Sequence, residues 1–427
     1  MFALEINILF YFISIVFFYR KDHSFSIRVA ILFLYLIFAI MGYYIVQTGI
    51  FFVQFGHYNI SDVSILPYVF NFLFILLLMT PFRFLRGKES KCICSLEQIK
   101  SKRIMYFERL VIILCFGYLF VGVLWFYKYG TADFVDIYTS NREGEHEYVF
   151  SNRLLNIFFF RTFHVLRWIT PFWCMIEFSK LINRIKMKQA LFYLVVFFIC
   201  LYIGCIVGSN RGGMIFTSTN LIFFIIIEWK YLSPKIRRTI IVIGCIAVIF
   251  IVMSLLSITL SRSDNDSDVA SFGVIRYFGE SFPNLGIRVW GASDEHIWGA
   301  RKFPFLFQLF GGYIPDFNGD KYVMVDYFER MYKYPVNNFK TFFGDIYAEF
   351  GIVVSFLIVC LYVWIVNLLI KKTSKSNLYV IFIYETYTLL TWGLFNCNIS
   401  QDFVVEFLLY VIIVFFIKNH KVKKKKV

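Results

Sequence analysis

Long apolar runs separated by short polar connectors are the main pattern along this chain. The runs are rich in Phe, Ile, Leu and Val on all sides, whereas a helix on the surface of a soluble protein is polar on one face. A helix needs about 20 such residues to cross the hydrocarbon core of a membrane. The eleven segments that we predict as transmembrane helices lie at about 2–19, 29–50, 64–82, 109–127, 157–178, 190–208, 213–229, 239–259, 341–370, 377–395 and 403–417.

The composition agrees with a chain that is mostly in contact with lipid. Apolar residues make up 59% of the 427 positions and charged residues only 17%. A soluble domain has a larger charged fraction, and these charges are too few to cover a water-facing surface around so many large apolar side chains. A set of soluble domains is therefore excluded. We predict an all-α polytopic integral membrane protein, with residues 1–427 forming a single membrane domain.

The connectors alternate in charge along the chain. One alternating set of connectors holds 28 of the 43 basic residues, whereas the other set is mixed or acidic. Basic residues in short loops mark the cytoplasmic side. The pattern predicts an N-terminus outside, a cytoplasmic C-terminus, and one large extracytoplasmic loop, residues 260–340, between the eighth and ninth spans. The net charge of +15 then indicates topology in a lipid bilayer and no nucleic acid partner.

The 260–340 loop has the composition of a sugar-binding surface. Loops of this length are uncommon unless they are functional. Aromatic rings stack on the apolar faces of sugars, while guanidinium and carboxylate groups bind hydroxyls and phosphates. An aromatic belt at the membrane interface, with arginines at the level of the lipid headgroups, is the alternative. The interleaved residues are Arg262, Arg276, Arg288, Arg301 and Arg330 with Tyr277, Trp290, Trp298, Tyr313, Tyr322 and Tyr327.

A turn rich in small residues joins the sixth and seventh predicted spans. It reads Ser209-Asn210-Arg211-Gly212-Gly213. An arginine between such residues at the mouth of a helical hairpin can approach a phosphate closely, and the amides at the start of the next helix add to its field. The alternative is a turn whose glycines are only conformational and whose Arg211 extends to lipid headgroups.

Ionisable residues inside the fifth predicted span form another candidate site. Arg161, His164 and Arg167 follow each other at a spacing of three, which places them on one broad face of a helix. Ionisable residues within a span point to function. We predict that Arg161 and Arg167 bind substrate, with extension of either side chain to the interface as the alternative.

A carboxylate pair stands where the large loop re-enters the membrane. Asp345 and Glu349 are four residues apart, with Tyr347 between them. The spacing suits a catalytic base, and it equally suits two acids that stabilise the dipole at the start of a helix. Tyr347 is a candidate for substrate binding.

The chain has no complete metal or cofactor motif. Asp264, Asp266 and Asp268 match the first ligands of an EF-hand loop, but Val269 and Ile275 stand where Gly and a bidentate Glu are needed. The histidines have no metal-ligand spacing, and no Walker loop or Gly-x-Ser-x-Gly motif occurs. We predict no metal and no cofactor.

Two stretches resemble bacterial O-antigen and oligosaccharide repeat-unit polymerases. The turn from Gly208 to Gly213 is similar to the small-residue and arginine turn in the middle of that family, and the run from Phe343 to Gly351 is similar to the Gly-acid-x-Tyr…Phe-Gly entry into the span after its large loop. The number of predicted spans and the position of the large loop are similar as well. The architecture is thus similar over nearly the whole chain, and the motifs over a short part of it.

The resemblance implies a GT-C-like fold and a metal-independent glycosyltransferase of the bacterial inner membrane. Such an enzyme moves a growing glycan from one undecaprenyl diphosphate to a hydroxyl of the next lipid-linked repeat unit, outside the cytoplasm. The product is a lipopolysaccharide O-antigen, a capsule or an exopolysaccharide. The implied partners are the undecaprenyl-diphosphate-linked oligosaccharide and the flippase and chain-length regulator of the same pathway.

This reaction needs two kinds of side chain. Arginines at the membrane surface neutralise the departing lipid diphosphate. The arginines for which the resemblance implies this role are Arg211, Arg142, Arg276 and Arg288. A carboxylate or His accepts the proton of the attacking hydroxyl. The sequence does not rank the candidate carboxylates, which are Asp345, Glu280 and Asp294.

Three other functions remain as alternatives. An O-antigen ligase would have a His-Asn/Ser/Gln motif in its large loop, whereas here His296 is followed by Ile297. A different polyprenyl-linked glycosyltransferase would place its acids in the first external loop, which has only Asp62. A polysaccharide flippase or other transporter would have short external loops and two similar halves, and neither is visible in this sequence.

Overall fold

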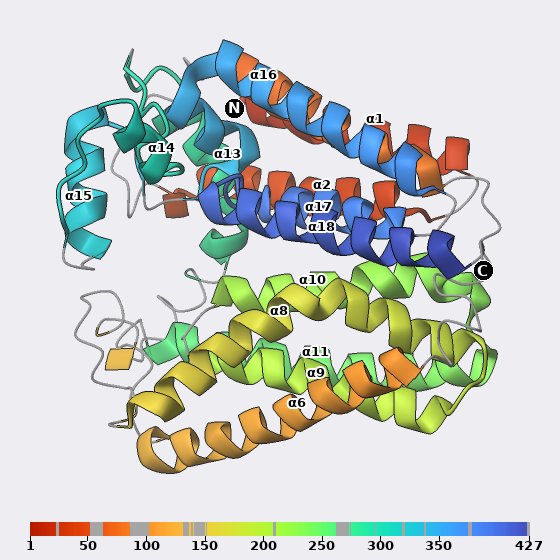
Figure 1. The fold of residues 1–427 in the computed structure, drawn as a ribbon. Coiled ribbons are helices and arrows are strands. Elements are labelled where there is room, and N and C mark those ends of the chain that lie inside the picture. The colour runs from red at the N-terminus through yellow and green to blue at the C-terminus, as the bar shows by residue number, and fades with distance from the viewer. Residues whose placement is uncertain are drawn as a thin grey trace. The chain divides into compact units, whose positions relative to one another are not determined.

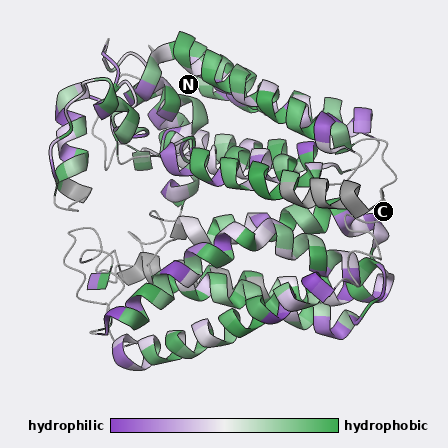
Figure 2. Cartoon of the chain, in the orientation of Figure 1, coloured by the Kyte–Doolittle hydropathy of each residue, from purple (hydrophilic) through white to green (hydrophobic). Residues whose placement is uncertain are grey.

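A computed structural model of the chain describes residues 1–22, 25–51, 63–85, 102–130, 136–137, 140, 150, 152–207, 211–261, 273, 275–293, 295–317, 321–336, 339–374 and 378–424. Over these ranges the chain is helical and contains no strand. Apolar residues extend along the helices (Figure 2). This is the arrangement that lipid requires, because every backbone polar group in a bilayer needs a partner within the protein.

Each of the eleven predicted segments overlaps a helix. The helices are α1 (Phe2–Asp22), α2 (Ile27–Gln47), α4 (Leu66–Leu78) with the 3-10 turn η1 (Thr80–Leu85), α6 (Lys102–Tyr129), α8 (Arg153–Ile182), α9 (Met187–Val207), α10 (Arg211–Glu228), α11 (Pro234–Ser261), α16 (Thr341–Thr373), α17 (Tyr379–Trp392) and α18 (Gln401–Lys424) (Figure 1).

Seven helical stretches within the described ranges are long and apolar enough to cross a membrane. They are α1, α2, α4 with η1, α6, α9, α10 with the 3-10 turn η2 (Trp229–Tyr231), and α16. The prediction of an all-α membrane protein is confirmed at this level. The count of eleven spans stays a prediction.

The contacts within the chain group its helices into two compact units. The first consists of Met1–Lys88 and Ser271–Val427, and the second of Glu89–Ala270. The second unit pairs α8 with α9, and α6 and α10 pack against this pair. Near the end of α8 the buried Lys180 forms ion pairs with Glu108 of α6 (2.5 Å) and with Glu177 (3.3 Å).

In the first unit, α17 is buried along its whole length. Its residues from Tyr379 to Thr391 are all buried, and Glu385 is its only charged residue. Burial of this kind is expected of a helix that is mostly apolar around its circumference. It packs against α16 and α4. Asn71 of α4 forms hydrogen bonds to two neighbouring helices. Its amide donates to the Tyr11 hydroxyl of α1 (3.1 Å), and its oxygen accepts from the backbone N–H of Phe343 (3.3 Å). Asn71 thereby supports the first turn of α16.

The 260–340 stretch, predicted as one long loop, contains short helices in its described part. They are α13 (Ser281–Pro283), the π-helical turn η3 (Asn284–Val289), α14 (Pro304–Leu309) and α15 (Lys321–Tyr332). All belong to the first unit. Figure 1 shows α14 and α15 at the end of this unit at which α16 begins. Residues of the stretch therefore lie next to the start of α16.

Candidate functional site at the start of helix α16

Helix α16 is divided into two parts at Gly351. The backbone of this residue has φ 69° and ψ −176°, which is not helical and is a conformation that favours glycine. The break leaves carbonyl groups at the end of the first part without their usual helical partners. Ile297 and Trp298 supply the missing donors, because their backbone N–H groups bond the carbonyls of Ala348 (3.1 Å) and Glu349 (2.6 Å). The loop residues are thereby attached to the break.

The other end of this first part, residues 341–350, is attached to the segment after α17. The backbone N–H groups of Lys340 and Thr341 both bond the carbonyl of Phe395 (2.9 Å each), and that of Phe342 bonds the carbonyl of Gly393 (2.8 Å). These contacts satisfy N–H groups that every helix start leaves unpaired. The first part of α16 is thus held at both ends by backbone hydrogen bonds to other segments.

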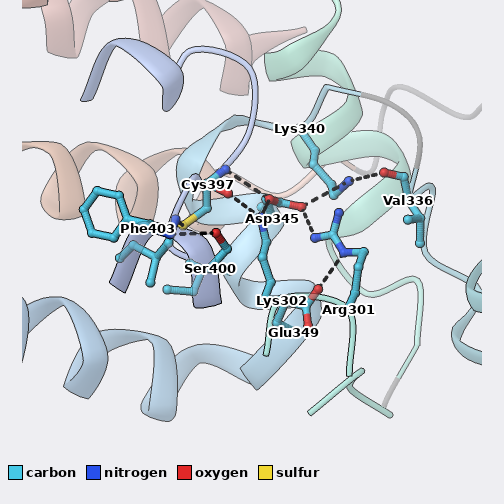
Figure 3. Close-up of polar contacts among 12 residues, drawn as sticks. Arg301, Lys302, Val336, Lys340, Asp345, Glu349, Cys397, Ser400 and Phe403 are labelled. Atoms are coloured by element: carbon cyan, nitrogen blue, oxygen red, sulfur yellow. Dashed lines mark hydrogen bonds and ion pairs between the residues drawn. The ribbon is translucent and has the colours of Figure 1, made fainter. Parts of the chain in front are cut away.

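Five charged side chains converge on the first part of α16 (Figure 3). Arg301 bridges the two predicted carboxylates, donating from Nη2 to Asp345 (2.5 Å) and from Nε to Glu349 (2.7 Å). Asp345 also pairs with Lys302 (2.5 Å) and Lys340 (3.3 Å). The second oxygen of Asp345 accepts the backbone N–H of Cys397 (3.1 Å). We call these five residues the ion cluster.

The ion cluster is buried and carries an excess of positive charge. It contains three cations and two carboxylates, a formal net of +1. The Asp345 and Glu349 side chains are 0% exposed and that of Lys340 is 1% exposed, whereas Arg301 retains 16%. Arg301 is therefore the member of the cluster with the most surface exposure.

Burial and attraction shift the titration of the cations in opposite directions. Burial lowers the pKa of Lys340 to about 8, although the Asp345 carboxylate opposes this change. Burial would also lower the pKa of Arg301, but attraction to Asp345 and Glu349 outweighs it and raises that pKa above its ordinary value. Arg301 therefore stays charged at every physiological pH, while Lys340 titrates close to neutrality.

Glu349 differs from Asp345 in how well its oxygens are paired. Both oxygens of Asp345 have donors, whereas only Oε1 of Glu349 is bonded, by Arg301. The buried Oε2 atom of Glu349 has no hydrogen-bond partner among the described residues. An unsatisfied buried carboxylate oxygen is costly and calls for an explanation.

Aromatic side chains pack beside the ion cluster. Trp290 stacks on Tyr347 with ring centroids 5.2 Å apart and planes at 25°, and it also contacts Phe343. His296 meets Tyr347 edge-on at 5.3 Å, and Tyr334 stacks on His296 at 6.2 Å. We call these five residues the aromatic group. It joins two residues predicted to bind substrate, Trp290 and Tyr347, across 57 positions of sequence.

His296 has a defined place in the aromatic group. Its Nδ1 lies 3.2 Å from the Tyr334 hydroxyl, which donates its proton to the carbonyl of Ser293 (3.0 Å). The hydroxyl oxygen is then the acceptor for His296, which favours the tautomer with hydrogen on Nδ1. Nε2 faces Gly351, where an added Cβ would lie only 2.6 Å away. Burial lowers the pKa of His296.

Other predicted residues of the large loop contact neighbours near the start of α16. Arg276 pairs with Glu280 at 3.3 Å. Arg288 donates to Asn284 (3.4 Å). The Tyr277 ring packs edge-on against Phe339. Tyr277 also packs against Phe395 (ring centroids 5.4 Å apart), whose carbonyl accepts the backbone N–H of Lys340.

Three predicted residues, Arg161, Arg167 and Arg211, belong to the second unit. Arg167 lies over the ring of Phe216 at 5.2 Å, while Arg161 and His164 are exposed on α8. Arg211 is the first residue of α10. The predictions for Arg142 and Asp294, and for the side chain of Arg211, fall outside the described residues.

The sequence did not indicate two of the three cations of the ion cluster, Lys302 and Lys340. Arg301 was recognised only as one of several loop arginines, and Lys302 and Lys340 carry no motif. One signal was available, since Lys340 directly precedes the predicted span that contains Asp345. Within the described ranges, no three His, Cys, Asp or Glu residues lie together as metal ligands would.

The chain was also compared with known proteins. No family model, no curated protein sequence and no solved structure matches it.

Proposed function

We propose that this protein is an extracytoplasmic glycosyltransferase that polymerises oligosaccharide repeat units carried on undecaprenyl diphosphate, as the sequence resemblance implies. The observation that best supports the proposal is the ion cluster beside the aromatic group. Both lie at the break in α16, where the large predicted loop meets a helix able to cross a membrane. The reaction needs cations for a diphosphate, a proton acceptor for a hydroxyl and a flat surface for sugars, and this region offers all three.

Arg301 is the residue that we assign to the departing lipid diphosphate. Its Nε and Nη2 atoms are bonded to carboxylates, while Nη1 has no bond to a described residue. A guanidinium group held rigidly in this way can stabilise the charge that develops on the leaving group without reorganising. Lys302 adds positive charge at the other oxygen of Asp345. Arg211, Arg142, Arg276 and Arg288 remain further candidates for this role.

Glu349 is the residue that we assign to proton acceptance from the attacking hydroxyl. Asp345 meets four donors, and Glu280 is paired with Arg276. By contrast, Oε2 of Glu349 lacks a partner, and an incoming sugar hydroxyl would supply the hydrogen bond that it lacks. In this scheme Asp345 is a positioning residue that holds the three cations in place.

The aromatic group provides the sugar-binding surface in this scheme. The partly exposed Trp290, supported by the buried Tyr347 that stacks on it, offers the ring for stacking against a pyranose, and Tyr334 and His296 add polar atoms nearby. The topology that we propose places this end of α16 outside the cytoplasm of a bacterial inner membrane, with the N-terminus outside and the C-terminus inside.

Deletion of the gene tests the proposed reaction in cells. We expect surface glycan that carries single repeat units instead of a ladder of long chains, and an unchanged ladder would contradict the proposal. Purified protein in detergent should elongate the lipid-linked repeat unit in the presence of a chelator. A strict requirement for a divalent metal would contradict the metal-independent mechanism.

Substitution of Glu349 tests the proposed proton acceptor. Glu349→Gln should lower kcat by about 100-fold or more, because general-base catalysis contributes a factor of this order, while the protein still folds. Glu295→Gln is the control, since Glu295 is an exposed acid of the large predicted loop. Elongation by Glu349→Gln at the wild-type rate would remove Glu349 from the mechanism.

A further inference from the structure

Helix α14 exposes a row of large apolar side chains outside the predicted spans. Phe305 is 62% exposed, Leu309 66%, Phe310 86% and the nearby Tyr313 79%, and Leu306 is also exposed. The positions 305, 306, 309 and 310 recur at the spacing of one helical face. Isolated exposed apolar residues are ordinary, but a contiguous patch of this kind marks an interaction surface.

This apolar face belongs to a well-defined turn of helix. Pro304 stands at the first helical position, where its missing N–H costs nothing. At the other end Gly311 has φ +86°, its N–H bonds the carbonyl of Gln308 (3.0 Å), and the N–H of Gly312 bonds that of Phe307 (2.9 Å). This is the Schellman cap. The exposed side chains are therefore presented on an ordered element.

Helix α14 and the residues just before it contact the start of α18 and the break in α16. The backbone N–H of Gln401, the first residue of α18, bonds the carbonyl of Lys302 (2.9 Å), and the Gln401 side chain accepts from the N–H of Phe305 (3.3 Å). Phe303 also packs against Phe350, one residue before the break in α16. Figure 1 shows α14 beside this end of α16.

The membrane-facing surface of α16 begins just past this contact. Val353 is 71% exposed, and Phe356 and Leu357 are exposed as well, on a helix that is able to cross a membrane. Exposed apolar side chains on such a helix are the ones that meet lipid. The apolar face of α14 is therefore linked, through the contact between Phe303 and Phe350, to the exposed apolar side chains of α16.

We propose that α14 is a membrane anchor whose apolar face inserts into the interfacial region of the bilayer beside the entry point of α16. The occupant of this face is the lipid surface itself. Two observations favour lipid: the link to the exposed side chains of α16, and the composition of the face, which combines aliphatic residues with Phe and Tyr as interfacial helices do. The inference does not depend on the proposed glycosyl transfer.

Insertion of α14 would fix the depth of the cations that precede it. Arg301 and Lys302 lie immediately before α14 in the chain and belong to the ion cluster. Basic side chains next to an inserted apolar segment lie at the level of the lipid phosphates. The proposed anchor therefore holds Arg301 at the depth at which a diphosphate attached to a membrane lipid is found.

Site-specific photocrosslinking tests the anchor directly. The photoreactive amino acid benzoylphenylalanine is incorporated at Phe310 or, in a second variant, at Leu309. The full-length proteins are reconstituted into vesicles that contain an alkyne-bearing phospholipid and are then irradiated. The control carries the same amino acid at Arg330, whose side chain is 79% exposed on the neighbouring α15. Only protein that elutes from a sizing column like the wild type is compared.

We expect about tenfold more lipid adduct at positions 310 and 309 than at position 330, because only the first two would lie in the interfacial region. Lipid labelling no higher than at position 330 would overturn the proposal. Adducts at the mass of two chains, or of this chain with another protein, in place of lipid adducts would overturn it too, because the face would then be a protein interface. None of these outcomes depends on catalytic activity, so the result stands apart from the tests of the proposed function.

Discussion

Replacement of Arg301 by Met should destabilise the protein more than replacement of either lysine partner of Asp345. Arg301 is the cation that contacts Glu349, at 2.7 Å, whereas Asp345 would keep Lys302 at 2.5 Å and Lys340 at 3.3 Å. The change therefore leaves one carboxylate, 0% exposed, without its counter-ion. Removal of one partner from a buried pair costs about 3–5 kcal/mol, and we expect the free energy of unfolding to fall by this amount.

A double-mutant cycle separates the ion pair from other effects of the substitution. Glu349→Gln added to Arg301→Met removes the unpaired charge, so the double variant should be more stable than Arg301→Met alone by about 1–3 kcal/mol. Lys302→Met is the matched control. Its loss leaves Asp345 with two cations and the N–H of Cys397, so the cost should be smaller, about 1–2 kcal/mol.

Equilibrium unfolding in mixed micelles, with rising mole fractions of sodium dodecyl sulfate and detection by circular dichroism, measures these free energies. Each variant is first checked for wild-type elution from a sizing column. Strictly additive costs in the double variant would refute the reasoning, because they would mean that Arg301 and Glu349 do not interact. An Arg301→Met variant as stable as Lys302→Met would refute it as well.

Three further predictions follow from the same region. Gly351→Ala should cost about 1–3 kcal/mol of stability because of the positive φ of residue 351. The new Cβ would also lie 2.6 Å from Nε2 of His296. The additional change His296→Ala should therefore recover part of the loss in the same unfolding assay, and no recovery would contradict the clash. Between about pH 8 and pH 10.5 the folded state binds fewer protons at Lys340 than the unfolded state does, so the free energy of unfolding should rise with pH across this window. Unfolding measured against pH should show this rise in the wild type and not in Lys340→Met. Equal pH profiles of the two proteins would contradict this prediction. Trp290→Ala should raise KM for the lipid-linked acceptor by up to about tenfold. Trp364→Ala, at an exposed position further along α16, should leave KM unchanged, and equal effects of the two changes would argue against sugar stacking.

The helices could be predicted from the sequence because backbone polar groups in lipid must form their hydrogen bonds within the protein. A run such as 29–50 has to satisfy its own N–H and C=O groups, and a helix does so within one segment. Hydropathy could not distinguish α17, which is 14 residues long and buried on every face, from a helix that crosses the membrane beside lipid. Glu385 is the only charged residue of α17, so both kinds of helix are mostly apolar, and tertiary packing separates them.

The candidate site could be predicted only in part, because several of its contacts join residues that are far apart in the sequence. Asp345 and Glu349 were visible because their spacing of four is local. Their partner Arg301 is 44 and 48 residues away in sequence, and nothing in the local pattern of the loop points to that pairing. Trp290 and Tyr347 were each predicted to bind substrate, but the stacking between their rings depends on how the large loop folds back on α16.

The break at Gly351 has a mechanical consequence for the site. A continuous helix would transmit any tilt of its membrane portion to its first turns, and helices do tilt to match the thickness of the surrounding bilayer. Here residues 341–350 are fastened by hydrogen bonds to Gly393 and Phe395 at one end and to Ile297 and Trp298 at the other. These attachments should make the geometry of the ion cluster depend less on membrane thickness than it would in a continuous helix, although Ser355 still donates to the carbonyl of Ile346 across the break (2.9 Å).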